Sequence, residues 1–200
     1  MSAAEIIKFD RDVPVNDFRG AMRHLVGGVA VITVGRDSDV SGMTVTSVAS
    51  LSVDPPSLIV SVNRAASSWP LLKRHGFFGV NILADQIEVA ERFAGKGGLK
   101  SVERFAGSEW TARAPGAPLL VGALVGIDCE VEEIVERNSH GIVIGRVRHL
   151  RVSPQGSALA YWRGKYVALD QDEDVAKLAE VGLPDKARKL EASRRDEGCL

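Results

Sequence analysis

The sequence predicts a mainly β protein with short helices, folded as a closed or nearly closed antiparallel barrel. Most of its apolar segments are short and alternate apolar with polar residues. Glycine, proline or asparagine bounds them, as is typical of strands. Short helical segments separate several of them, and the last pairs are typical of hairpins, which favours antiparallel neighbours. With 200 residues, of which 45% are hydrophobic, the chain can form one domain with a sizeable core.

The first predicted elements are a short helix and a buried strand. The segment DFRGAMRHL, which starts at Asp17, has an acidic beginning and apolar residues at helical spacing, and Gly27-Gly28 end it. The apolar run VAVITVGR then predicts a buried strand, and RDSDVSG predicts the loop that leads to the next one.

A hydroxyl-rich strand is predicted next, over residues 44–52. Side chains alternate between the two faces of a strand, so the face that holds Leu51 and Val53 is expected to join the core. The opposite face offers mainly hydroxyl groups. The run ends at Pro55-Pro56 because proline cannot donate a hydrogen bond to a strand ladder.

The remaining segments continue this pattern. SLIVSVN and GFFGVNIL predict strands, and between them SSWPLLKRH predicts a short helix with Ser67 as its N-cap. DQIEVAERFAG predicts another helix, whereas residues 95–120 lack periodicity and are expected to form a long surface excursion. LVGIDCEVEEIVER and GIVIGRVRHLRV predict a hairpin, and LAYWRGKYVAL predicts two short strands.

These elements predict one domain over residues 17–170. An extension over residues 1–16 precedes it, and a charged, helix-like tail over residues 171–200 follows it. We find no internal repeat.

Composition argues against several classes of protein. The 25 Lys and Arg residues nearly balance the 26 Asp and Glu residues, so the net charge of −1 argues against a partner nucleic acid. Cys129 and Cys199 are too few for a disulfide framework or a four-ligand zinc site, and the histidines lack metal-ligand spacing, so no metal is expected. No apolar run approaches the roughly 18 residues of a membrane span. The charged start does not resemble a signal peptide, and we expect a cytoplasmic location.

No catalytic side chain is predicted. The sequence contains no G-x-G-x-x-G after a strand, no P-loop, no H-E-x-x-H and no G-x-S-x-G. An enzyme of this kind would rely on a cofactor for its chemistry. A flavin needs donors along its dicarbonyl edge, which residues 44–52 offer, and a phosphate site, which Ser67 and Ser68 offer near a helix start. Both features also occur without a ligand, and Ser67 is also explained as a helix cap alone.

Several segments, in this order and at these spacings, resemble the short-chain flavin reductase family. They are GMTVTSVASLSVDPPSLIVSVN, SSWPLL, FGVNIL, AERFAG, HGIVIGRV and YWRGKY, within residues 15–170. The T-x-x-S run that leads to Asp-Pro-Pro is the most specific of them. Members of the family are FMN-binding split β-barrels with antiparallel, Greek-key-like strands. They include the reductase components of two-component flavin-dependent monooxygenases, such as the partner of 4-hydroxyphenylacetate monooxygenase.

The resemblance implies a flavin site whose residues contact, in turn, the isoalloxazine ring, its edge and ribityl chain, the phosphate, and the border of the pocket. In that order they are Thr46, Ser47 and Val48; Ser61, Val62 and Asn63; Ser67 and Ser68; and Phe93.

The resemblance also implies a nicotinamide site. Many members have G-D-H before the last long strand, where this chain has Asn138-Ser139-His140. His140 is therefore implied to contact NADH or NADPH, and Tyr166 to close over the flavin or the nicotinamide. Taken without the family, His140 is a turn histidine and Tyr166 an ordinary strand aromatic.

We therefore expect an NAD(P)H:flavin oxidoreductase that reduces FMN or FAD by hydride transfer and supplies it to a partner monooxygenase. Two alternatives stay open: a flavoprotein whose tightly bound FMN reduces its own substrate, and a non-catalytic flavin- or haem-binding split barrel. We also expect a homodimer, because Phe105 and Trp110 in residues 95–120 are apolar groups that a single domain would leave exposed.

Overall fold

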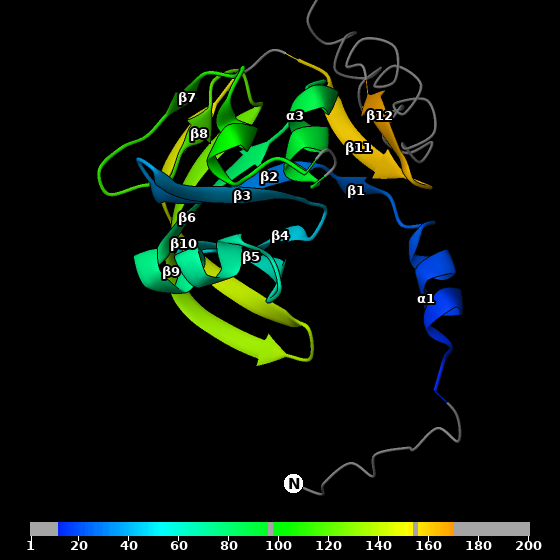
Figure 1. The fold of residues 1–200 in the computed structure, drawn as a ribbon. Coiled ribbons are helices and arrows are strands. Elements are labelled where there is room, and N and C mark those ends of the chain that lie inside the picture. The colour runs from blue at the N-terminus through cyan, green and yellow to red at the C-terminus, as the bar shows by residue number, and fades with distance from the viewer. Residues whose placement is uncertain (1–11, 96–97, 154–155, 170–200) are drawn as a thin grey trace, which may run out of the picture.

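Seven strands form one antiparallel sheet that curls into a barrel (Figure 1). The structure is a computed structural model that describes residues 12–95, 98–153 and 156–169, so the predicted tail and most of the predicted extension lie outside the described residues. The strand order is β3-β2-β6-β9-β10-β5-β4. The strands are β2 (Ala30–Arg36), β3 (Asp39–Val45), β4 (Val48–Val53), β5 (Pro56–Asn63), β6 (Phe77–Ile82), β9 (Val125–Arg137) and β10 (His140–Val152).

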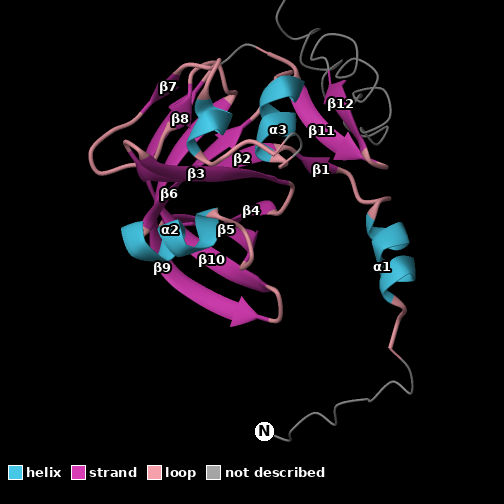
Figure 2. Ribbon diagram, in the orientation of Figure 1, coloured by secondary structure: helices cyan, strands magenta, loops and turns pink. Residues whose placement is uncertain are grey.

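Shorter elements surround the barrel (Figure 2). Two smaller sheets are formed by β1 (Gly27–Gly28), β11 (Ala158–Trp162) and β12 (Lys165–Leu169), and by β7 (Trp110–Thr111) and β8 (Leu119–Leu120). The helices are α1 (Val15–Met22), α2 (Ser68–His75), α3 (Ile87–Phe93) and the 3₁₀-helix η1 (Val102–Phe105). The expected mainly β, antiparallel architecture is confirmed. Within the described ranges, none of the helices has the length and apolar character to cross a membrane.

The two edge strands of the barrel sheet, β3 and β4, follow each other in the chain. Residues 46–47 join them, and β3 pairs with β2 while β4 pairs with β5. The barrel sheet is therefore open along a seam between the edge strand β3 and the edge formed by β4 and the end of β5. Across it, the Ser47 hydroxyl donates to the Ser61 carbonyl at 2.9 Å.

The prediction of one continuous strand over residues 44–52 is wrong. The turn at residues 46–47 sends its two halves to opposite edges of the sheet, and a register shift between Ser50 and Ser52 breaks the alternation of faces. Leu51 and Val53, which were expected in the core, are 52% and 90% exposed.

Two hydrophobic cores lie on opposite faces of β2. Ile32 and Val34 contribute to the core inside the barrel, and Val31 contributes to a second core under α3. This double burial explains why the segment VAVITV is apolar at nearly every position. Helix α2 adds Trp69 and Leu72 to the first core, so it covers the barrel beside the seam.

The described part of the predicted excursion after the gap, residues 98–120, folds back onto its own domain. Leu119 and Leu120 are 4% and 2% exposed, and Phe105 and Trp110 pack against the second core. The argument that this segment exposes apolar groups for a dimer interface is therefore wrong. The segment contains η1, β7 and β8. These elements have only two to four residues each, which is too short for a periodic pattern in the sequence.

Candidate functional site

A groove follows the seam of the barrel between β3, the end of β5 and α3. Its main hollow, the seam groove, has a volume of about 540 Å³, and a hollow of about 360 Å³ adjoins it. Thr44, Val45 and Ala94 line both hollows, so the two are continuous. The other residues that line the seam groove are Gly42, Met43, Ser61, Asn63, Ala65, Ala66, Ser67, Phe93, Gly95, Arg104 and His140.

The wall of the groove on the α3 side is held against β3 by a hydrogen bond and by ring packing. The Thr44 hydroxyl donates to the Ala90 carbonyl at 2.6 Å, which ties α3 to the strand. A Cβ atom at Gly42 would lie 2.7 Å from Cε1 of Phe93, so only glycine lets the ring pack this closely on the strand. Phe105 contacts Phe93 edge to face, with ring centroids 5.0 Å apart, and this packing restricts the orientation of the Phe93 ring.

The start of α2 brings a serine hydroxyl into the groove. Ser67 is the N-cap residue, as predicted, but its side chain makes no capping hydrogen bond and instead lies 2.9 Å from the Ser41 hydroxyl. Ser68, one residue later, is fully buried, and its hydroxyl contacts the sulfur of Met43 at 3.7 Å. The first amides of a helix lack intrahelical acceptors and favour an anion. Ser67 is placed to contact such an anion, and the Ser68 side chain is not.

Sequence reasoning missed an arginine in the same groove. Arg104 belongs to η1, and its Nη1 donates to the Gly42 carbonyl at 3.0 Å. Ser101, at the start of η1, places its hydroxyl 3.5 Å from that of Ser67. The groove therefore combines a serine hydroxyl, a helix start and a guanidinium, which together suit a phosphate.

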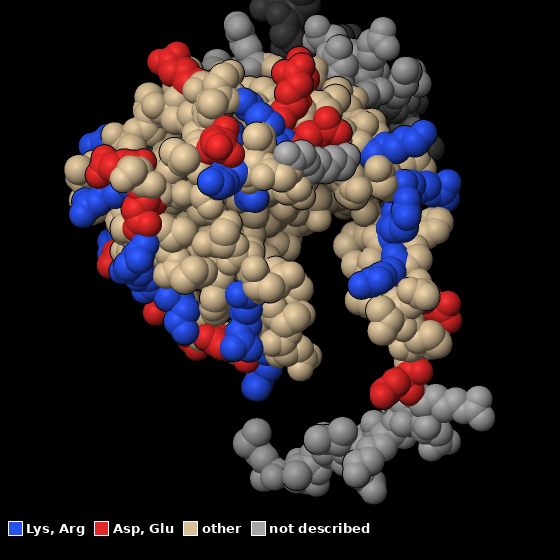
Figure 3. Space-filling model, in the orientation of Figure 1, with Lys and Arg blue, Asp and Glu red and all other residues tan. Residues whose placement is uncertain are grey.

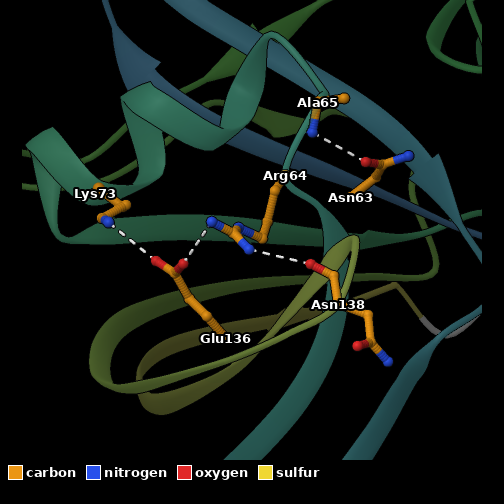
Figure 4. Close-up of polar contacts among 6 residues, drawn as sticks. All are labelled: Asn63, Arg64, Ala65, Lys73, Glu136 and Asn138. Carbon is orange, nitrogen blue, oxygen red and sulfur yellow. Dashed lines mark hydrogen bonds and ion pairs between the residues drawn. The ribbon is translucent and has the colours of Figure 1, made fainter.

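An ion-pair cluster joins the loop after β5 and the last turn of α2 to the end of β9 and the β9–β10 turn (Figure 4). Arg64 contacts the Glu136 carboxylate at 2.9 Å and the Asn138 carbonyl at 3.0 Å, and Lys73 donates to Glu136 at 3.0 Å. The hydrogen bond from Lys73, assisted by the charge of Arg64, holds the pKa of Glu136 below its ordinary value. The Asn63 side chain accepts from the Ala65 amide at 2.9 Å, which shapes the loop between them.

The pairing of β10 with β5 places His140 beside the groove. His140 starts β10 and pairs with Asn63 of β5, so both residues line the groove from adjacent strands. The Ser139 hydroxyl lies 2.8 Å from Nδ1 of His140 and fixes the ring through that nitrogen. Ser139 and His140 thus form one hydrogen-bonded pair at the rim of the groove.

Tyr166 lies in the adjoining hollow, with Thr46 and Tyr161. Its ring packs against Tyr161 with centroids 5.2 Å apart. The structure therefore gives the two predicted nicotinamide residues different places: His140 lines the seam groove, and Tyr166 lines the hollow next to it.

The remaining predicted flavin residues are divided between the groove and the core. Ser61, Asn63, Ser67 and Phe93 line the seam groove, and Thr46 lines the adjoining hollow. Ser47 lies exposed at the seam. Val48 packs against the barrel core and Val62 is fully buried there, so the Val62 side chain faces away from the groove.

The described residues of the groove offer hydroxyls, backbone groups, the Phe93 and His140 rings and the Arg104 guanidinium. Among the residues that the structure describes, no group of three His, Cys, Asp or Glu side chains could hold a metal ion. A planar, polar and uncharged ring with an anionic tail matches this wall, with the tail at Ser67 and Arg104.

Comparison with known families identifies the family to which the chain belongs. Residues 22–170 match the model of the flavin reductase like domain. The chain belongs to this family. It is 37% identical over 166 residues to a flavin reductase of Pseudomonas putida, which covers 82% of this chain and 94% of the relative. It is 33% identical over 159 residues to the reductase subunit HsaB of a flavin-dependent monooxygenase from Rhodococcus jostii, which covers 79% of this chain and 80% of that subunit.

Solved structures of this family share the fold. The NADH:FAD oxidoreductase SgcE6 of Streptomyces globisporus, in complex with NAD and FAD fragments, superposes with a TM-score of 0.71 at 29% identity, covering 80% of this chain and 94% of that one. The predicted split-barrel fold and the predicted NAD(P)H-dependent flavin reductase activity are both confirmed.

Proposed function

We propose that the seam groove binds the flavin, with its phosphate at Ser67 and Arg104 and its ring system along the seam past Thr44–Thr46. The observation that carries this assignment is the convergence of a helix start, a serine hydroxyl and a guanidinium at one end of a groove with uncharged walls. Phe93 and Val45 supply apolar contact, and the backbone and hydroxyl groups of the seam supply polar contact.

When bound, the flavin supplies the hydride-accepting chemistry, and the protein positions the two rings. His140 orients the nicotinamide nucleotide, since it lines the groove and its ring is fixed by Ser139. Hydride transfer to the flavin needs no acid or base from the protein.

We further propose that the flavin exchanges freely and serves a separate monooxygenase. The groove and its adjoining hollow are open to the surface, which favours release, and HsaB is itself a reductase subunit. Steady-state kinetics with NADH tests this: the rate should saturate with added free FMN or FAD. A rate that ignores added flavin would show a prosthetic group instead. The cytoplasmic location stays a prediction.

We also propose a homodimer, now on the evidence of α1. This helix stands away from the barrel, and an open gap separates the two in Figure 3. Phe18 and Met22, one turn apart, are 59% and 44% exposed, and no residue of α1 is buried. An unpartnered apolar stripe of this kind indicates a protein interface. A second copy of the chain is the simplest occupant, because two-fold pairing buries both helices at once.

Sedimentation equilibrium tests the homodimer. The wild type should have a mass near twice 21.4 kDa, and Phe18→Asp should shift it toward 21.4 kDa. Asp17→Asn, a polar change on the same helix, is the matched control and should leave the mass unchanged. A wild-type mass of one chain would refute the dimer.

A further inference from the structure

The seam groove lies on the outer face of strand β5, and this face continues onto β10 and β9. Along β5, Val60 and Val62 belong to the barrel core. Ser61 and Asn63, which alternate with them, line the groove. Because side chains alternate along paired strands, the residues of β10 and β9 that are in register with Ser61 and Asn63 face the same way. The outer face of β10 and β9 therefore lies beside the groove.

A row of three cross-strand neighbours crosses this outer face. Asn63 of β5 pairs with His140 of β10, and His140 pairs with Arg137 of β9. Neighbouring strands are about 4.8 Å apart, so Arg137 lies one strand beyond His140 and roughly 10 Å from the β5 side of the groove. The next row on the same face adds Ile142, which is 41% exposed, and its partner Val135. A ligand that leaves the groove past His140 therefore meets an apolar surface and a guanidinium.

Positive charge exceeds negative charge at this end of the β9–β10 hairpin. Arg137 is exposed, and its guanidinium makes no hydrogen bond or ion pair to any residue that the structure describes. Glu133, the next acidic residue on the same face of β9, is four residues away, or about 13 Å along the strand. On the other face, Arg64 and Lys73 share the single carboxylate of Glu136 (Figure 4). Three cations thus surround one carboxylate, and Arg137 is the cation that faces the side of the groove.

A phosphate monoester is the group that fits this position. The planar guanidinium of an arginine binds phosphate through two parallel hydrogen bonds, and NADP-binding proteins use arginine for the 2′-phosphate. NADPH carries this phosphate on its adenosine ribose, at the opposite end of the molecule from the nicotinamide, and NADH lacks it. A nucleotide whose nicotinamide lies in the groove passes His140 before its adenosine reaches Ile142 and Arg137.

We propose that Arg137 binds the 2′-phosphate of NADPH and makes NADPH the preferred hydride donor of this chain. The proposal rests on the proposed function, in which His140 orients the nucleotide beside the flavin. His140 acts on both nucleotides, whereas Arg137 acts on a group that only NADPH has. The adenosine lies over Ile142, which gives it apolar contact without discriminating between the two nucleotides.

Calorimetric titration of the full chain with NADP⁺ and with NAD⁺ tests this proposal. The oxidised nucleotides cannot reduce the flavin, so binding is measured without turnover, on protein loaded with FMN and in a buffer without added phosphate. One charge-assisted contact at an exposed site should make NADP⁺ bind about tenfold more tightly than NAD⁺. In steady-state assays, kcat/KM for NADPH should exceed that for NADH by about the same factor.

Variants separate the specific contact from the shared one. Arg137→Gln should weaken NADP⁺ about tenfold and NAD⁺ less than about twofold, because it removes a contact that only NADP⁺ makes. Arg137→Lys keeps the charge but loses the planar pair of donors, and should retain a preference of about threefold. Arg36→Gln, the same change at an exposed arginine outside the groove, is the matched control and should alter neither constant. His140→Ala should weaken both nucleotides equally and leave their ratio at about tenfold.

Three results would overturn the proposal. They are no binding of NADP⁺ at about 10 mM, a wild-type affinity for NAD⁺ that equals or exceeds that for NADP⁺, and an equal loss of both in Arg137→Gln. The last result would place the guanidinium at the pyrophosphate, which both nucleotides share. Failure of the proposed function has a different signature, because neither NADH nor NADPH would then reduce the flavin, whereas failure of this inference alone leaves flavin reduction intact.

Discussion

Two adjacent serines at the start of α2 give a sharp test of the flavin phosphate site. Ser67→Ala removes a hydroxyl that lines the seam groove, whereas Ser68→Ala removes one that is fully buried against Met43. A hydrogen bond to a charged group contributes about 1.5–3 kcal/mol. Because Ser67 is exposed and Arg104 remains to hold the phosphate, we expect the lower part of that range, about 1.5–2 kcal/mol. The dissociation constant for FMN should then rise about 10- to 30-fold.

Fluorescence titration with FMN and with riboflavin is the assay. Riboflavin lacks the phosphate. Ser67→Ala should therefore weaken the binding of FMN and leave the affinity for riboflavin unchanged. Ser68→Ala is the matched control and should change FMN affinity less than about threefold, since its hydroxyl makes only a weak contact with sulfur. An equal loss for FMN and riboflavin in Ser67→Ala, or a larger loss in Ser68→Ala, would refute the assignment of the phosphate to this end of the groove.

Three further predictions concern the groove and the core. His140→Ala should raise the KM for NADH about tenfold and leave flavin affinity unchanged; equal effects on both would show that this side chain does not act on the nucleotide. Gly42→Ala should destabilise the fold by about 1–3 kcal/mol in denaturant melts, because the new Cβ meets the Phe93 ring, and wild-type stability would contradict that packing. Burial raises the pKa of Cys129 to about 12, so in Cys199→Ser this thiol should resist a disulfide reagent at about pH 8 until the protein unfolds. Fast reaction in the folded state would show that the thiol is accessible.

The sequence predicted best the elements whose pattern is local. The continuous apolar run VAVITVGR predicted β2, which is buried on both faces. The alternation of apolar and polar residues on both sides of a short turn predicted the β9–β10 hairpin. The helix around Phe18 also formed, although none of its residues is buried. Local pattern fixes the type of an element but not what covers it.

The site was harder to predict because it depends on where separate segments meet. Arg104 reaches the groove from a segment without periodicity, so no sequence pattern marked it. Ser67 and Ser68 were assigned the same role, yet one step along a helix turns the second hydroxyl into the interior. Val62 was named with its neighbours Ser61 and Asn63, but alternation along β5 sends its side chain into the core.

Anaerobic titration with NADH and NADPH tests the central claim most directly. The protein is mixed with equimolar FMN or FAD, and the visible absorbance of the oxidised flavin is followed as nucleotide is added. A flavin reductase should abolish this absorbance at about one equivalent of at least one nucleotide, far faster than the same mixture without protein. Flavin that stays oxidised with both nucleotides, in the presence of folded protein, would contradict the account.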